Sequence, residues 1–243
     1  MQHKTKALSK LILDSSLALS LFSSSAYAAQ FSVTIQNLTH GTHFTPLLVA
    51  AHDANTSVFK AGTTASSSLQ AMAEGGSISA LSTDLTSSGA LLNMNPASGL
   101  LASGSSTQTA MMNTDGTNNK YLSVVAMVLP SNDGFMGLSN WMIPSEPGTY
   151  TINVNAYDAG TEANNELLGA ANAGAAGTLG APGAPSGSAG TGGTGVASVD
   201  HNQHIHIHRG ILGDTNSTGG ASDFDSRVHR WLNPVARITV VVE

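Results

Sequence analysis

Alternation of apolar and polar side chains runs through much of the chain and predicts β-strands. It is clearest over most of Phe31–Leu38 and again over Gly148–Tyr157. Successive side chains of a strand point to opposite faces, so each of these segments should bury one face. Tyr121–Leu129 is almost continuously apolar, which predicts a strand that is buried on both faces and ends before Pro130. Val235–Val242 is expected to form the last strand.

Shorter patterns predict the remaining elements. Pro46–Ala51 is expected to be a strand or a buried extended segment, and Gln108–Met112 a further strand. Ser66–Ala73 has apolar residues at helical spacing after a serine cap, and Ile78–Leu85 could add a second helical segment. The fold class is therefore all-β: an antiparallel β-sandwich with long loops and one or two short helices. The strand pattern alone leaves immunoglobulin-like and C2-like topologies open.

One internal segment, Gly169–Ser198, consists almost entirely of Gly, Ala, Ser, Thr and Pro. It has too little apolar surface to offset the entropy lost on ordering, so we expect a flexible insertion at about 169–198. The alternative is a linker to a second domain, but the roughly 45 residues after it are too few and too polar to fold alone. The sequence thus predicts a single domain over residues 29–243.

The first 28 residues have the pattern of a secretory signal peptide. Three lysines precede the mostly apolar run Leu11–Phe22, and Ala26–Ala28 is a small-x-small cleavage site. The alternative, a membrane anchor, would need a longer and less interrupted apolar run, and no other segment approaches about 18 apolar residues. We expect a secreted or periplasmic protein without an integral membrane segment.

Charge and cysteine content narrow the classes of partner. The chain has 9 basic and 15 acidic residues; removing three lysines and one aspartate with residues 1–28 leaves 6 and 14, a net charge of −8 with neutral histidines. Such a surface repels nucleic acid and anionic membranes. The chain has no cysteine. Without disulfides, an exported domain has to be held by its core, by a metal, or by both.

Three segments of the chain are similar to known patterns: Val128–Leu138 to V-x-P-S-P-D-W-F-V-G-V, Val154–Glu162 to L-Y-P-Y-D-A-G-T-D, and Leu232–Val241 to L-P-P-I-A-R-V-T-L-V. In these segments and in their order, the chain resembles the spondin N-terminal domain family, which occurs in animal extracellular-matrix proteins and in exported bacterial proteins. The chain departs from the first pattern at Asn132, where the family has Pro, and at Gly134, where it has Trp.

This resemblance implies a C2-like β-sandwich with calcium in its loops and a role in cell adhesion or extracellular recognition. It implies no catalytic activity, and we expect a non-enzymatic protein. The expected partner is an unidentified extracellular protein or glycan. In line with this, the chain has no Gly-x-Ser-x-Gly elbow between a strand and a helix and no phosphate-binding Gly-x-x-x-x-Gly-Lys motif.

By the same resemblance, Asp133 and Asp158 match the calcium ligands of the family. A third family ligand is an acidic residue just before the long buried strand; Asp115 is the nearest candidate, with spacing off by about one residue. Glu162 is a further candidate. Calcium takes six to eight oxygen ligands, usually including several carboxylates. The alternative is that Asp133 and Asp158 are turn residues that bond backbone amides in Asx-turns.

Histidines suggest a second kind of metal site. His204, His206 and His208 alternate with isoleucines, so on a strand all three imidazoles would point to one face. Such a set could bind zinc or copper, as a metal-binding protein or a metalloenzyme. The alternative is a polar strand face at a loop edge, with the isoleucines covering the core.

Overall fold

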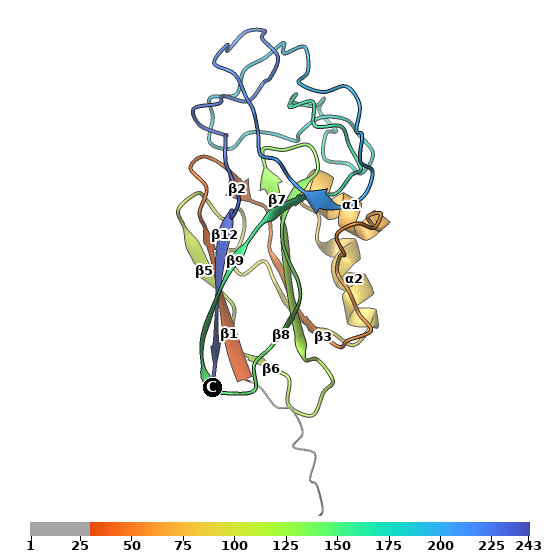
Figure 1. The fold of residues 1–243 in the computed structure, drawn as a ribbon, viewed down its shortest axis with the longest axis vertical. Helices are drawn as coiled ribbons and strands as arrows, with labels where there is room; N and C mark the ends of the chain where they lie inside the picture. Colours follow the sequence, from red (N-terminus) through yellow and green to blue (C-terminus); the bar gives the residue numbers. More distant parts are fainter. Residues whose placement is uncertain (1–29) are drawn as a thin grey trace, which may run out of the picture.

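The computed structural model describes residues 30–243 as two antiparallel sheets packed face to face (Figure 1). The first sheet has the order β5-β1-β12-β9, with β6 also paired to β1. Its strands are β1 Gln30–Asn37, β5 Ser106–Gln108, β6 Met112–Asn113, β9 Gly148–Val154 and β12 Ala236–Val242. Alternate residues of β1 and β12, including Val33, Ile35 and Ile238, are fully buried between the sheets.

The second sheet has the order β11-β10-β8-β7-β3-β4, with β2 paired to β7. Its strands are β2 His43–Phe44, β3 Leu48–His52, β4 Leu91–Met94, β7 Tyr121–Leu129, β8 Gly134–Met142, β10 Ala156–Asp158 and β11 His206–Ile207. Within each sheet, all neighbouring strands pair antiparallel. The all-β antiparallel sandwich with long loops and two short helices is therefore confirmed.

Two helices cover the outer face of the second sheet, α1 Ser67–Gly75 and α2 Ser79–Ser87. Ser66 caps α1 as predicted, because its hydroxyl accepts a hydrogen bond from Leu69 N at 3.2 Å. Leu69 and Met72 pack with Val125 and Met127 of β7 in a second apolar cluster. Strand β7 is thus buried on both faces, which explains its continuous apolar sequence. Within residues 30–243, neither helix is long and apolar enough to cross a membrane.

The segment expected as one strand, Gly148–Tyr157, divides between the two sheets. Strand β9 pairs with β12 in the first sheet, and the chain then passes at Asn155 into β10, which pairs with β8 in the second. Strand β8 itself was not predicted, since its Gly137, Ser139 and Asn140 interrupt the alternation. This change of sheet brings the end of β10 beside the turn between β7 and β8.

Long loops fill one end of the sandwich, above the ends of β7 and β10 (Figure 1). Residues 169–198 lie in this layer and contain no helix or named strand. The backbone of residues 169–198 donates hydrogen bonds to buried acidic side chains: Gly177 N to Glu74 at 2.5 Å and Gly193 N to Asp223 at 3.0 Å. The predicted flexibility of this insertion stays a prediction. The expected signal peptide lies outside the described residues.

Candidate metal site at the loop end of the sandwich

Asp133 and Asp158 come from neighbouring chain segments at one end of the second sheet. Asp133 lies in the turn between β7 and β8, and Asp158 is the last residue of β10, paired with Gly134. The Asp133 carbonyl oxygen accepts a hydrogen bond from Ala159 N at 3.2 Å. Both aspartates are buried, with 0% and 1% of their surface exposed. The two residues expected from the sequence are thus brought together.

The two oxygens of the Asp133 carboxylate have different surroundings. Oδ2 accepts hydrogen bonds from Thr161 N at 2.8 Å, from Thr161 Oγ1 at 3.2 Å and from Glu162 N at 3.2 Å. Oδ1 is buried and has no hydrogen-bond partner. Buried polar atoms are nearly always paired, so an unpaired carboxylate oxygen points to a missing positive or donor group. The Asx-turn alternative does not describe Asp133, because its amide donors, Thr161 and Glu162, lie far along the chain and not two residues on.

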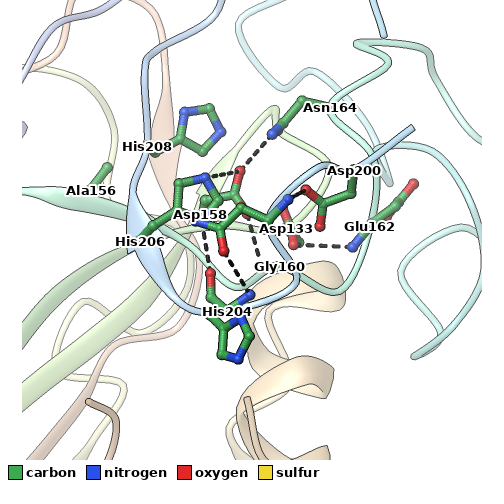
Figure 2. A network of polar contacts seen from close by, with 12 residues as sticks. Asp133, Ala156, Asp158, Gly160, Glu162, Asn164, Asp200, His204, His206 and His208 are labelled. Atoms are coloured by element: carbon green, nitrogen blue, oxygen red, sulfur yellow. Dashed lines mark hydrogen bonds and ion pairs between the residues drawn. The ribbon is translucent and has the colours of Figure 1, made fainter. Parts of the chain in front are cut away.

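Unlike Asp133, Asp158 accepts a hydrogen bond on each of its two carboxylate oxygens (Figure 2). Its Oδ1 accepts a hydrogen bond from Gly160 N at 2.9 Å, which is the contact of an Asx-turn, and its Oδ2 accepts one from Asn164 Nδ2 at 2.5 Å. His206 Nε2 lies 3.7 Å from Oδ2. The hydrogen bonds from Gly160 and Asn164 thus fix the orientation of the Asp158 carboxylate, which neighbours Asp133.

The electrostatics of the pair favour a cation. Burial, and after it the neighbouring charge of Asp158, raises the pKa of Asp133 to about 8. Burial also raises the pKa of Asp158, against the lowering effect of the Asn164 hydrogen bond. Two buried carboxylates side by side have to take up a proton or gain a counter-charge. A divalent cation supplies that charge and bonds oxygen directly.

Glu162 borders the same region. Its Oε1 accepts hydrogen bonds from Asn132 Nδ2 at 3.0 Å and from Gly180 N, whereas its Oε2 is buried without a partner. Burial raises the pKa of this carboxyl group too. Its main-chain nitrogen donates to Asp133. The backbone of Glu162 therefore contacts Asp133, and its side chain bonds Asn132 of the turn between β7 and β8 to Gly180 of the loop layer.

Asp115 lies at the other end of the sandwich. It precedes the first residue of β7, Tyr121, whereas Asp133 follows the last, Leu129. Nine strand residues at about 3.3 Å each separate the two ends by roughly 30 Å. Asp115 is exposed, and its backbone nitrogen donates to Asn113 Oδ1 at 2.8 Å. The structure does not bring Asp115 to the aspartate pair.

The three histidines lie in different environments. His204 is exposed, His206 faces Asp158, and His208 is buried with its ring centroid 4.9 Å from that of Trp231. His208 Nδ1 accepts a hydrogen bond from Gly210 N at 3.0 Å, and burial lowers its pKa to about 3. Only His206 and Ile207 form a strand, so the expected single face of three imidazoles is not formed.

Both departures from the family pattern have a structural role. The Asn132 side chain donates to Glu162 and, at 2.8 Å, to Asn165, and its oxygen accepts from Glu166 N at 3.0 Å. A Cβ at Gly134 would lie 3.0 Å from His208 Cδ2. The histidine ring therefore lies directly beside the position where the family has a tryptophan side chain.

Two further residues at the site were not foreseen. Asn164 bonds Asp158, and Asp200 adds a second acidic side chain near it. The sequence Asp200–Asn202 has the spacing of an Asx-turn, which was the available signal for an ordered carboxylate. In the part of the chain from residue 30 onward, no three His, Asp or Glu side chains are close enough together to hold one metal ion.

The family model described as Spondin_N matches residues 18–168, which include Asp133, Asp158 and Glu162. The match ends before residues 169–243, which supply Asp200, β11 and β12. No curated protein matches the chain.

Proposed function

Because the chain belongs to the Spondin_N family, whose domains are extracellular and generally non-enzymatic, we propose that it is an exported calcium-binding module. In this proposal the module is non-catalytic and serves adhesion or extracellular recognition. Asp133 and Asp158 supply the carboxylate ligands. The ion neutralises their buried charge and holds the loop end of the sandwich in one arrangement.

One observation carries the proposal: Asp133 Oδ1 is a fully buried carboxylate oxygen without a hydrogen-bond donor, next to a second buried carboxylate. An unpaired buried charge reduces the free energy of unfolding by roughly several kcal/mol unless a cation or a proton compensates it. Calcium prefers carboxylate and carbonyl oxygens and accepts irregular coordination that includes water. The oxygens of Asp133 and Asp158 fit these requirements.

The proposed role of the ion is structural. Asp133 belongs to the turn between β7 and β8, and Asp158 begins the chain that enters the loop layer. A cation between them would join the sheet edge to residues 159–168, whose amides already donate to Asp133. Binding energy for a folded-state ligand adds directly to stability. Calcium should therefore stabilise the loops that form the exposed end of the protein.

For recognition we propose that the loop end contacts an extracellular protein or a glycan. A hollow of about 610 Å³ opens beside Asp158 and includes Asn164, Asp200 and His206. It combines oxygen and nitrogen groups with the exposed apolar side chain of Ile207. Mixed lining of this kind is suited to a polar ligand of moderate size.

Zinc or copper binding through His204, His206 and His208 is the alternative proposal. The separation of the three imidazoles gives it less support than the aspartate pair gives to calcium. Of these three histidines, His206 lies beside a carboxylate, that of Asp158. One imidazole and one carboxylate would supply fewer than the three or four protein ligands that zinc takes.

The test is a thermal unfolding experiment on the mature chain in calcium and in chelator. Calcium should raise the melting temperature of the wild type, and the double change Asp133→Asn and Asp158→Asn should abolish the rise. Asp115→Asn removes an exposed carboxylate at the opposite end and is the matched control. An unchanged melting temperature of the wild type in saturating calcium would refute the proposal.

A further inference from the structure

A loop from outside the family match covers the aspartate pair. Gly160, two residues after Asp158, has φ +70°, and a Cβ there would lie 2.6 Å from Gln203 C and 2.7 Å from His204 N. The backbone at 202–204 therefore crosses directly over the turn that follows Asp158. Glycine at position 160 is required both for its positive φ and for this close approach.

Asp200 begins this crossing and is oriented within it. Its Oδ1 accepts a hydrogen bond from Asn202 N at 2.9 Å, which closes an Asx-turn and fixes the carboxylate. Its Oδ2 is buried and has no hydrogen-bond partner. Asp200 thus repeats the pattern of Asp133: one carboxylate oxygen is satisfied and the other is buried and free.

Asp200 is a neighbour of Asp158. Asp200, Asp158, Asn164 and His206 all line the hollow of about 610 Å³. Burial is the main cause of the raised pKa of Asp158, and the charge of Asp200 adds the smallest of the named effects in the same direction. Figure 2 shows Asp200 among the residues drawn around Asp158. Asp158 therefore has two acidic neighbours, Asp133 and Asp200, and each of these has an unpaired, buried carboxylate oxygen.

We propose that Asp200 is a third carboxylate ligand of the cation held by Asp133 and Asp158. This inference rests on the proposed calcium site and adds to it a ligand from beyond residue 168, where the family match ends. The ion would then bind the 197–204 loop to the sandwich. A third carboxylate supplies charge and oxygen ligands toward the six to eight that calcium takes.

Coordination by all three carboxylates requires a movement of this loop, because within residues 30–243 no three His, Asp or Glu side chains lie close enough together to hold one ion. The backbone allows it. Val196 N bonds Asn165 O at 2.9 Å, and Ile205 N bonds Thr63 O at 2.8 Å, at the two ends of the segment. Between them, the hydrogen bonds of Asn202 N and His204 N are local to the segment itself. The 197–204 loop can therefore close on an ion while its ends stay fixed.

The experiment compares calcium affinity by isothermal titration calorimetry for the wild type, Asp200→Asn, Asp133→Asn and Asp115→Asn. Calcium affinity depends strongly on the number of charged ligands, so Asp200→Asn should weaken binding about tenfold or more. Asp133→Asn should weaken it further, and Asp115→Asn should leave it unchanged. Asp200→Ala serves as a second variant if the asparagine form does not fold.

Hydrogen exchange of residues 197–204 in calcium and in chelator gives a second readout. Calcium should slow exchange there in the wild type but not in Asp200→Asn. If Asp200→Asn binds as tightly as the wild type while Asp133→Asn does not bind, the role of Asp200 is refuted and the aspartate site stands. If the wild type binds no calcium, both proposals fail. Equal protection of the loop in the wild type and in Asp200→Asn would also overturn the inference.

Discussion

Asp133 and Asp158 lie side by side in a buried region at the loop end of the sandwich, and burial together with the charge of Asp158 raises the pKa of Asp133 to about 8. A buried pair of like charges opposes folding unless another group compensates it. The same pair that is proposed to bind calcium should therefore destabilise the protein when calcium is removed.

Asp133→Asn should make the calcium-free protein more stable at alkaline pH. The pKa of Asp133 is raised from 3.8 to about 8 on folding, so the folded state retains a proton that the unfolded state loses, and stability falls as pH rises through this interval. Asp133→Asn removes this loss. The free energy of unfolding of the variant should exceed that of the wild type by at least about 1 kcal/mol at pH 9.

Urea unfolding in chelator at pH 5 and pH 9 measures this difference. The gain of Asp133→Asn over the wild type should be larger at pH 9 than at pH 5. A variant that is less stable than the wild type at pH 9 would show that the Asp133 carboxylate is not a destabilising charge.

Gly160→Ala should loosen the loop that crosses the aspartate pair. The position has φ +70°, and the new Cβ would meet the backbone of Gln203 at 2.6 Å. Strain and displacement together should cost about 1–3 kcal/mol. Gly89→Ala is the matched control, because Gly89 has φ +82° but no atom within 4 Å of its added Cβ. Chemical denaturation should show a larger loss for Gly160→Ala than for Gly89→Ala.

His52 should make the fold sensitive to mild acid. Its Nε2 lies 2.8 Å from Ser123 Oγ, and its Nδ1 lies 2.9 Å from Asp53 O; Ser123 Oγ also accepts from Asn140 N at 3.0 Å, beside the irregularity between β7 and β8. Burial lowers the pKa of His52 below 6.5, so the unfolded state takes up a proton first as pH falls. Stability due to His52 is therefore present above about pH 6.5 and is lost below it.

Unfolding free energies at pH 7.5 and pH 5.5 test this for the wild type, His52→Gln and the exposed control His40→Gln. His52→Gln should reduce the loss of stability between the two pH values, and His40→Gln should not. The same acid sensitivity in His52→Gln and the wild type would assign the effect to other groups.

Asn132→Ala should weaken the attachment of the loop layer to the sheet. The side chain bonds Glu162, Asn165 and Glu166 N in a buried position, so its loss leaves buried partners unpaired at a cost of about 1–3 kcal/mol. Asn153→Ala is the control, since Asn153 is exposed on β9. Denaturant midpoints that are equal for the two variants would contradict this role of Asn132.

Strong local patterns made much of the fold predictable. The alternation in Phe31–Leu38, the apolar run Tyr121–Leu129 and the cap at Ser66 correspond to β1, β7 and α1. Strand β8 was missed because its glycines and polar residues reflect close packing: a Cβ at Gly137 would lie 2.6 Å from Phe59. The crossing from β9 to β10 at Asn155 was also missed, since alternation continues through the change of sheet.

The candidate site was predictable only where the sequence contains a motif. Asp133 and Asp158 follow from the resemblance, and antiparallel pairing of β8 with β10 then brings them together. Asp200 could not be placed in this way, because its position depends on the passage of a distant loop over Gly160. Contacts of this kind arise from tertiary packing and leave no periodic pattern in the sequence.

Elemental analysis of the mature, untagged protein tests the central claim most directly. After exposure to calcium and removal of free ions, the account predicts one calcium per chain, and none in the Asp133→Asn, Asp158→Asn double variant. A wild-type protein that retains no calcium, or that holds zinc or copper in a form sensitive to changes at His204, His206 and His208, would contradict it.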